Sequence, residues 1–167
     1  MKSPDEIKQL LGDAIAERVQ DNQTIAFGTA STVNCAISSI GRRVKEEGLN
    51  IRAVSSSLST SRAAMSFGIP VLELNSNPKI DWGFDGTDEV TETLAAIKGG
   101  GAAMYSEKCL ALRCPHWILI ADYRKLVDRL GAKPIPLEVE PSQLQYVMDN
   151  LPACIHKYSI REGSGSY

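Results

Sequence analysis

The sequence predicts an α/β protein with a doubly wound, mostly parallel sheet, followed by a small and incomplete α+β unit. Short runs rich in Val, Ile and Phe alternate with stretches whose apolar residues recur at helical spacing, the pattern of βαβ units. The chain has 167 residues, 43% hydrophobic and 23% charged, which is enough for one sizeable core and excludes a disordered or fibrous protein.

The first expected element is an amphipathic helix. Apolar residues recur at helical spacing from Ile7 to Val19, and Ser3 and Pro4 supply a cap and a first-turn proline. Strands and helices then alternate in this order: strand 24–28, helix 32–47, strand 51–55, helix 59–67 and strand 70–74.

The second half continues the alternation and then changes character. An apolar strand ends in a polar turn, a glycine cluster precedes a helix, and a buried strand follows, over residues 80–86, 102–113 and 116–122. We expect the doubly wound layer to end near residue 130. The remainder predicts a strand at 135–139, a helix at 142–151 and a strand at 155–160, and it finishes in the loop-like sequence GSGSY.

Charge and composition narrow the class of function. The net charge is −2 and no run is rich in Lys or Arg, which argues against nucleic acid or an anionic membrane and favours a small-molecule substrate. The N-terminus lacks a leader pattern, and no run approaches the ~18 apolar residues of a membrane span.

The cysteine spacing predicts reduced thiols in a cytoplasmic protein. Cys35, Cys109, Cys114 and Cys154 are too far apart for a C-x-x-C motif. Cys109 and Cys114 with His116 are an alternative as metal ligands, but they run from a helical pattern into a strand-like one, so buried packing is the favoured interpretation.

The first motif with chemical potential is residues 27–32, between a strand and a helix. Backbone N–H groups and hydroxyls at a helix N-terminus are the usual means of holding a phosphate. Plain capping by Ser or Thr explains this motif equally well when it is taken alone.

The second motif is the acidic turn from Asp85 to Glu89. Asp85 and Asp88 place two carboxylates at the end of an apolar strand, where chemistry tends to gather. Such a pair can bind sugar hydroxyls or tune a nearby base, although a solvated loop remains the alternative.

The third motif is harder to explain structurally. Lys98 precedes three glycines that permit close approach to a ligand, and Glu107 lies on the second turn of the following helix. A lysine and a carboxylate flanking an opening are what proton abstraction beside a carbonyl requires. Lys125, after another strand end, adds a cation to the same expected edge.

These segments, taken in order, resemble the type A ribose-5-phosphate isomerase family. The resemblance rests on GTxST, AVSSS, DGxDE, KGGGAA followed by EK, ADxxKxVDxLG and PxPLEV, and extends from the first helix to the last predicted strand. It implies a Rossmann-like catalytic domain over residues 1–131 and a partial α+β small domain over residues 132–167.

The resemblance also implies a reaction. Glu107 is implied as the base that interconverts D-ribose 5-phosphate and D-ribulose 5-phosphate through a cis-enediolate, in the non-oxidative pentose phosphate pathway. Asp85, Asp88 and Lys98 are implied as its catalytic partners, and no metal or organic cofactor is implied. The implied substrate contacts are Thr29, Ala30, Ser31, Thr32, Asp85, Gly86, Thr87, Asp88, Lys98, Gly99, Gly100, Gly101 and Lys125.

Two departures from the family accompany the match. Ala30 replaces the second glycine of GTGST, so its methyl group should narrow the loop and require a negative φ. Family members continue beyond the counterpart of Tyr167, so we expect a shortened small domain; the homodimer that the family forms is a further implication.

Two other functions stay open. A sugar-phosphate-binding regulatory module would need no base, and an inactive truncated paralogue would need no turnover. A dinucleotide enzyme is disfavoured because G-x-G-x-x-G does not follow the first strand. His116 and His156 lie outside the matched motifs, and we expect them to be structural.

Overall fold

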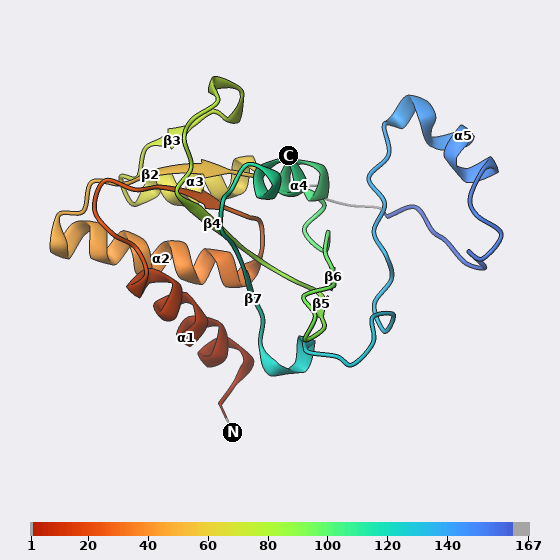
Figure 1. Cartoon of the computed structure of the whole chain (residues 1–167), viewed down its shortest axis with the longest axis horizontal. Coiled ribbons are helices and arrows are strands. Elements are labelled where there is room, and N and C mark those ends of the chain that lie inside the picture. The colour runs from red at the N-terminus through yellow and green to blue at the C-terminus, as the bar shows by residue number, and fades with distance from the viewer. Residues whose placement is uncertain (1, 162–167) are drawn as a thin grey trace.

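Five parallel strands form the main sheet in the order β3-β2-β1-β4-β7 (Figure 1). The structure is a computed structural model that describes residues 2–161. The strands are β1 (Thr24–Phe27), β2 (Arg52–Ser55), β3 (Val71–Leu72), β4 (Trp82–Gly86) and β7 (Trp117–Ile120). The chain moves outward from β1 to β3 and then returns to the other side of β1, so a switch point lies between β1 and β4. In open α/β sheets, ligands bind outside the carboxyl ends of the strands at such a point.

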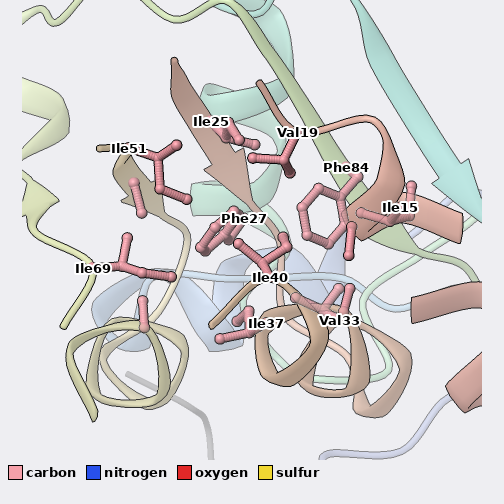
Figure 2. Close-up of a cluster of buried hydrophobic side chains, with 14 of the residues drawn as sticks. Ile15, Val19, Ile25, Phe27, Val33, Ile37, Ile40, Ile51, Ile69 and Phe84 are labelled. Carbon is pink, nitrogen blue, oxygen red and sulfur yellow. The ribbon is translucent and has the colours of Figure 1, made fainter. Parts of the chain in front are cut away.

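Helices cover both faces of this sheet, as the alternating pattern predicts. One core cluster joins the sheet to α1 (Pro4–Glu17), α2 (Ser31–Glu47) and α3 (Leu58–Ser66), and a smaller cluster joins the other face to α4 (Met104–Leu112). Figure 2 shows Phe27 and Phe84 from adjacent strands meeting Val33 and Ile37 of α2. The two phenyl rings lie with their centroids 5.3 Å apart, and both side chains are fully buried.

Local signals explain where the helices begin and end. Ser3 and Glu6 form a reciprocal capping box at the start of α1, with Pro4 in the first turn. The Ser57 side chain caps α3, and α2 ends at Gly48 in the left-handed conformation with φ 71°. Short 3-10 turns occur at Leu74–Ser76 and Tyr123–Lys125.

A two-stranded antiparallel hairpin, β5 (Glu89–Val90) with β6 (Ala96–Ile97), was not predicted from the sequence. Each strand has two residues, too few to show an alternating pattern. The Thr87 hydroxyl contacts the carbonyl oxygens of Glu89 at 2.7 Å and Ile97 at 3.0 Å, which ties the hairpin to the end of β4. The hairpin thereby brings Lys98 back beside that end.

The C-terminal part differs from the prediction. The expected helix is present as α5 (Leu144–Asp149) after a 3-10 turn at Pro141–Gln143, and it lies apart from the sheet (Figure 1). The strands expected at 135–139 and 155–160 are wrong, because within residues 2–161 neither segment pairs with another strand. A strand needs a partner to satisfy its backbone groups. The sequence GSGSY lies outside the described residues. Large apolar side chains exposed here are Ile135, Leu137, Tyr146, Ile155, Tyr158 and Ile160.

Two further expectations can be compared with the fold. Cys114 follows α4 and is half-buried, and its thiol contacts the Leu110 carbonyl oxygen. Burial raises the pKa of this thiol to about 11. It therefore packs as a protonated thiol. Across residues 2–161, no helix is both long enough and apolar enough to cross a membrane.

We expect the segment from residue 134 to 160 to be the least protected part of the described chain. It has one short helix, exposed apolar side chains and few backbone hydrogen bonds, the features of low local stability. Hydrogen exchange should reach completion there before it does in β1 and β4. Protection equal to that of the main sheet would contradict this and would show that a partner covers the segment.

Candidate active site

The residues singled out in the sequence gather around one cavity of about 410 Å³ at the carboxyl ends of β1 and β4. This is the switch point of the sheet. Of the expected site residues, all line the cavity except Thr32 and Asp85, which are buried behind its wall. The lining residues are Thr29, Ala30, Ser31, Asn34, Ser59, Thr60, Gly86, Thr87, Asp88, Lys98, Gly99, Gly100, Gly101, Glu107 and Lys125.

A lysine between two carboxylates forms the charged centre of the site. Lys98 Nζ lies 2.7 Å from Asp85 Oδ2 and 3.3 Å from Glu107 Oε2, and it also donates to the carbonyl oxygen of Gly86. Asp85 is fully buried and Glu107 is 3% exposed. Within the described residues these two carboxylate oxygens have no hydrogen bond of regular geometry, so the ion pairs with Lys98 are their compensation.

The secondary structure explains how the three groups meet. Side chains alternate along β4, so Phe84 enters the core beneath α2 and Asp85 faces the side covered by α4. Glu107 lies on α4, and Lys98 follows β6. Gly28, in the adjacent strand end, makes room for Asp85, because a Cβ built on Gly28 would lie 2.0 Å from Asp85 Cγ.

Burial and charge leave Glu107 with an unusual acidity. Burial, followed by the negative charge of Asp85, raises the pKa of Glu107 to about 7, against the opposing effect of Lys98. Burial also raises the pKa of Asp85, opposed by Lys98 and by the N–H groups of Gly86 and Thr29 at 2.7 and 3.1 Å from Oδ1. Since Asp85 receives the additional backbone bonds, the proton of this coupled pair belongs mainly to Glu107.

The start of α2 offers a site for an anion. Ala30 occupies the N-cap position and makes no side-chain cap bond, so the first N–H groups of the helix are left for a ligand. The negative φ expected of Ala30 is confirmed at −159°, an extended conformation without strain. Its methyl group faces Gly86, because a Cβ built on Gly86 would lie 2.6 Å from the Ala30 methyl carbon. The Thr29 hydroxyl lies 2.7 Å from that of Ser56, which anchors the loop to the end of β2.

The glycine loop after Lys98 closes another side of the cavity. Gly99 has φ 109°, in the region that favours glycine, and it lies against Pro136. The N–H of Gly100 donates to Asp88 Oδ2 at 3.0 Å. Lys125 Nζ donates to the carbonyl oxygen of Thr87, so this second lysine is held beside the turn after β4.

Three cavity residues were missed in the sequence. Asn34 lies one helical turn after Ala30, and Ser59 and Thr60 belong to the hydroxyl-rich start of α3. The i to i+4 spacing in α2 was the available signal for Asn34. Nothing in the local sequence distinguishes Ser59 from an ordinary exposed serine at a helix start.

The sequence matches the family described as Ribose 5-phosphate isomerase A (phosphoriboisomerase A) over residues 52–167. The chain belongs to this family. Its sequence is 43% identical over 135 residues to ribose-5-phosphate isomerase A of Enterococcus faecalis, covering 81% of this chain and 60% of that protein.

Solved structures of isomerases agree in fold. A ribose 5-phosphate isomerase from Plasmodium falciparum is 32% identical with a TM-score of 0.86, covering 96% of this chain and 72% of that one. A D-ribose-5-phosphate isomerase in complex with phospho-erythronic acid is 32% identical with a TM-score of 0.85, covering 90% and 66%. The α/β fold and the family resemblance are thus confirmed, and the chain spans 60 to 72% of the length of these isomerases.

The raised pKa of Glu107 predicts a stability difference that depends on pH. A carboxyl with its pKa raised from 4.5 to about 7 stabilises the fold below pH 4.5, and this contribution is lost as pH rises toward 7. Glu107→Gln mimics the protonated form at every pH. We expect the variant and the parent to be similarly stable near pH 5, and the variant to be more stable by about 3 kcal/mol near pH 8.

Urea unfolding at the two pH values measures this difference. Titrating groups remote from Glu107 are common to both proteins and cancel in the comparison, whereas the interactions of Glu107 with Asp85 and Lys98 are part of the measured difference. A stability difference between the two proteins that does not change with pH would contradict the raised pKa.

Proposed function

We propose that this isomerase-family chain interconverts D-ribose 5-phosphate and D-ribulose 5-phosphate, with Glu107 as the proton-transfer base. The observation that carries the proposal is a cavity-lining carboxyl with a pKa of about 7, beside a lysine at 3.3 Å. A general base works best when its pKa lies near the working pH. The regulatory alternative explains no such group, because binding a sugar phosphate requires no base.

The proton moves between neighbouring carbons of the open-chain sugar. Glu107 removes the proton from C2 of the aldose, and the electron pair forms the C1–C2 double bond while the carbonyl oxygen at C1 becomes negative. Lys98 stabilises that oxygen. Glu107 then returns its proton to C1, and the proton lost from the C2 hydroxyl is transferred to the C1 oxygen, which gives the ketose. Asp85 holds Lys98 in place, and Asp88 is assigned to a sugar hydroxyl.

The phosphate is assigned to the other end of the cavity. The N-terminus of α2, with residues 29–32, offers N–H groups and hydroxyls, and Lys125 adds a positive charge. Holding the phosphate there fixes the carbon chain over Glu107. Binding of phospho-erythronic acid by a related isomerase supports this assignment, since that ligand also joins a phosphate to a chain of hydroxyls.

Several broader features belong to the same proposal. We assign residues 1–131 to a Rossmann-like catalytic domain and residues 132–167 to a partial small domain. Reduced cysteines support a cytoplasmic protein, and the low net charge supports the absence of a nucleic-acid partner. A homodimer is proposed from the family alone.

The purified chain should convert ribose 5-phosphate to ribulose 5-phosphate, and EDTA should not change the rate, because carboxylates and a lysine supply the chemistry. The assay follows the ketose formed, with and without chelator. Loss of activity on chelation would overturn the mechanism. A folded chain without activity would favour the regulatory or inactive interpretation.

Glu107→Gln should lower turnover by about 10²- to 10⁴-fold, because the amide keeps the shape of the side chain but is no base. Binding of ribose 5-phosphate should persist.

Lys98→Ala should weaken both turnover and binding, since it removes the positive charge that stabilises the bound substrate as well as the enediolate. Turnover and calorimetric binding separate these roles, with exposed Glu92→Gln as the matched control. Near-normal turnover in Glu107→Gln would refute the assignment of the base.

A further inference from the structure

One arginine outside the expected set contacts the glycine loop directly. Arg161, in the segment after α5, donates from Nη1 to the carbonyl oxygen of Gly99 and from Nη2 to that of Gly100, each at 3.0 Å. Both glycines line the cavity, whereas Arg161 does not. The guanidinium group therefore acts on the loop from outside the cavity.

These two bonds fix the direction of two successive peptide groups. A trans peptide group is planar, so its C=O and the following N–H point in opposite directions, and the described chain has no cis peptide bond. With the Gly99 carbonyl turned to Arg161, the N–H of Gly100 points away and donates to Asp88 Oδ2 at 3.0 Å. By the same geometry the N–H of Gly101 also points away from Arg161.

The N–H of Gly101 is free to meet a ligand. Gly101 lines the cavity, and within residues 2–161 its N–H donates to no protein acceptor. Gly101 lies beside Thr29 at the cavity wall, since a Cβ built on Gly101 would come within 3.0 Å of the Thr29 carbonyl oxygen. A backbone N–H held in advance toward a negatively charged oxygen of the ligand stabilises that charge without reorganising.

We propose that Arg161 is a positioning residue, which holds the glycine loop so that the N–H of Gly101 donates to an oxygen of the sugar phosphate. The inference rests on the proposed isomerase function. An arginine suits this role because its planar fork carries several N–H groups in fixed directions and can bridge two carbonyl oxygens, whereas a lysine offers a single ammonium centre.

The loop needs such a restraint because of its composition. Three successive glycines have the greatest backbone freedom of any tripeptide, so they populate many conformations unless other groups fix them. The turn bond from the Ala102 N–H to the Gly99 oxygen, at 3.0 Å, and the Asp88 bond fix part of the loop. The carbonyl of Gly100 has its bond to Arg161 alone within the described residues.

Steady-state kinetics with ribose 5-phosphate test the proposal. Arg161→Ala and Arg161→Lys should each lower kcat/KM by about 10- to 100-fold, mainly through kcat, because the loop is misplaced while the phosphate contacts remain. Added guanidinium ion should restore part of the activity of Arg161→Ala only. Arg113→Ala is the matched control, since Arg113 donates to the Leu74 carbonyl oxygen at 2.6 Å away from the cavity, and it should leave kcat/KM unchanged.

Amide NMR signals supply a readout independent of turnover. The signals of Gly100 and Gly101 should shift in Arg161→Ala and move back when guanidinium is added. If the alanine variant fails to fold, the lysine variant carries the same comparison.

The outcomes separate this inference from the proposed function. An inactive parent chain would defeat the proposed function, while an active parent with unchanged Arg161→Ala would overturn the role of Arg161 alone. Full activity in Arg161→Lys would show that charge is sufficient and would overturn the bridging role. Loss of activity without guanidinium rescue, together with a lowered unfolding midpoint, would reduce Arg161 to a stabilising contact and also overturn the proposal.

Discussion

The placement of Lys98 between two buried carboxylates is the interaction on which the site depends. An isolated charge in a protein interior is strongly destabilising, and a buried ion pair is tolerated only when geometry and further hydrogen bonds compensate for lost hydration. Here two acids share one lysine, so compensation is incomplete by one charge. Burial, together with this imbalance, raises the pKa of Glu107 to about 7, and Asp85 accepts the backbone N–H groups of Gly86 and Thr29. Removing either acid would relieve the imbalance, and removing the lysine would worsen it.

The topology of the sheet supplies the three groups from separate parts of the chain. Asp85 arrives on a central strand, Glu107 on a helix of the opposite layer and Lys98 on a hairpin of two-residue strands. Burial of Asp85 and Glu107 fixes the first two of these groups. The hairpin contributes two buried apolar side chains, Val90 and Ile97, and the hydroxyl of Thr87 fixes it to the end of β4. Thr87 thus supports the charged centre from a position that touches none of the three charges.

Much of the fold could be predicted from the sequence because burial imposes a period on it. The helices α1 and α2 each bury several residues on one face, and β1 and β4 are short runs buried along their whole length, whereas α4 buries two residues, Glu107 and Leu110. The β5–β6 hairpin has strands of only two residues, and the segments at 135–139 and 155–160 have strand-like residues without a partner strand within residues 2–161. The residues of the site likewise fall into two groups, those that a sequence motif identifies and those that only the tertiary structure identifies. Motif residues such as Glu107 were identifiable, whereas Ser59 and Arg161 acquire meaning only from their tertiary neighbours.

The carbonyl contacts of the two lysines have a consequence for the entropy of binding. Lys98 and Lys125 donate to the carbonyl oxygens of Gly86 and Thr87, two consecutive peptide groups at the end of β4. A free lysine side chain loses up to ~2 kcal/mol of rotamer entropy when it is immobilised. In this protein that loss is incurred during folding, before any ligand arrives. An anionic ligand would therefore meet cations that are already ordered, and ordering them lowers the stability of the folded chain rather than the affinity of the site.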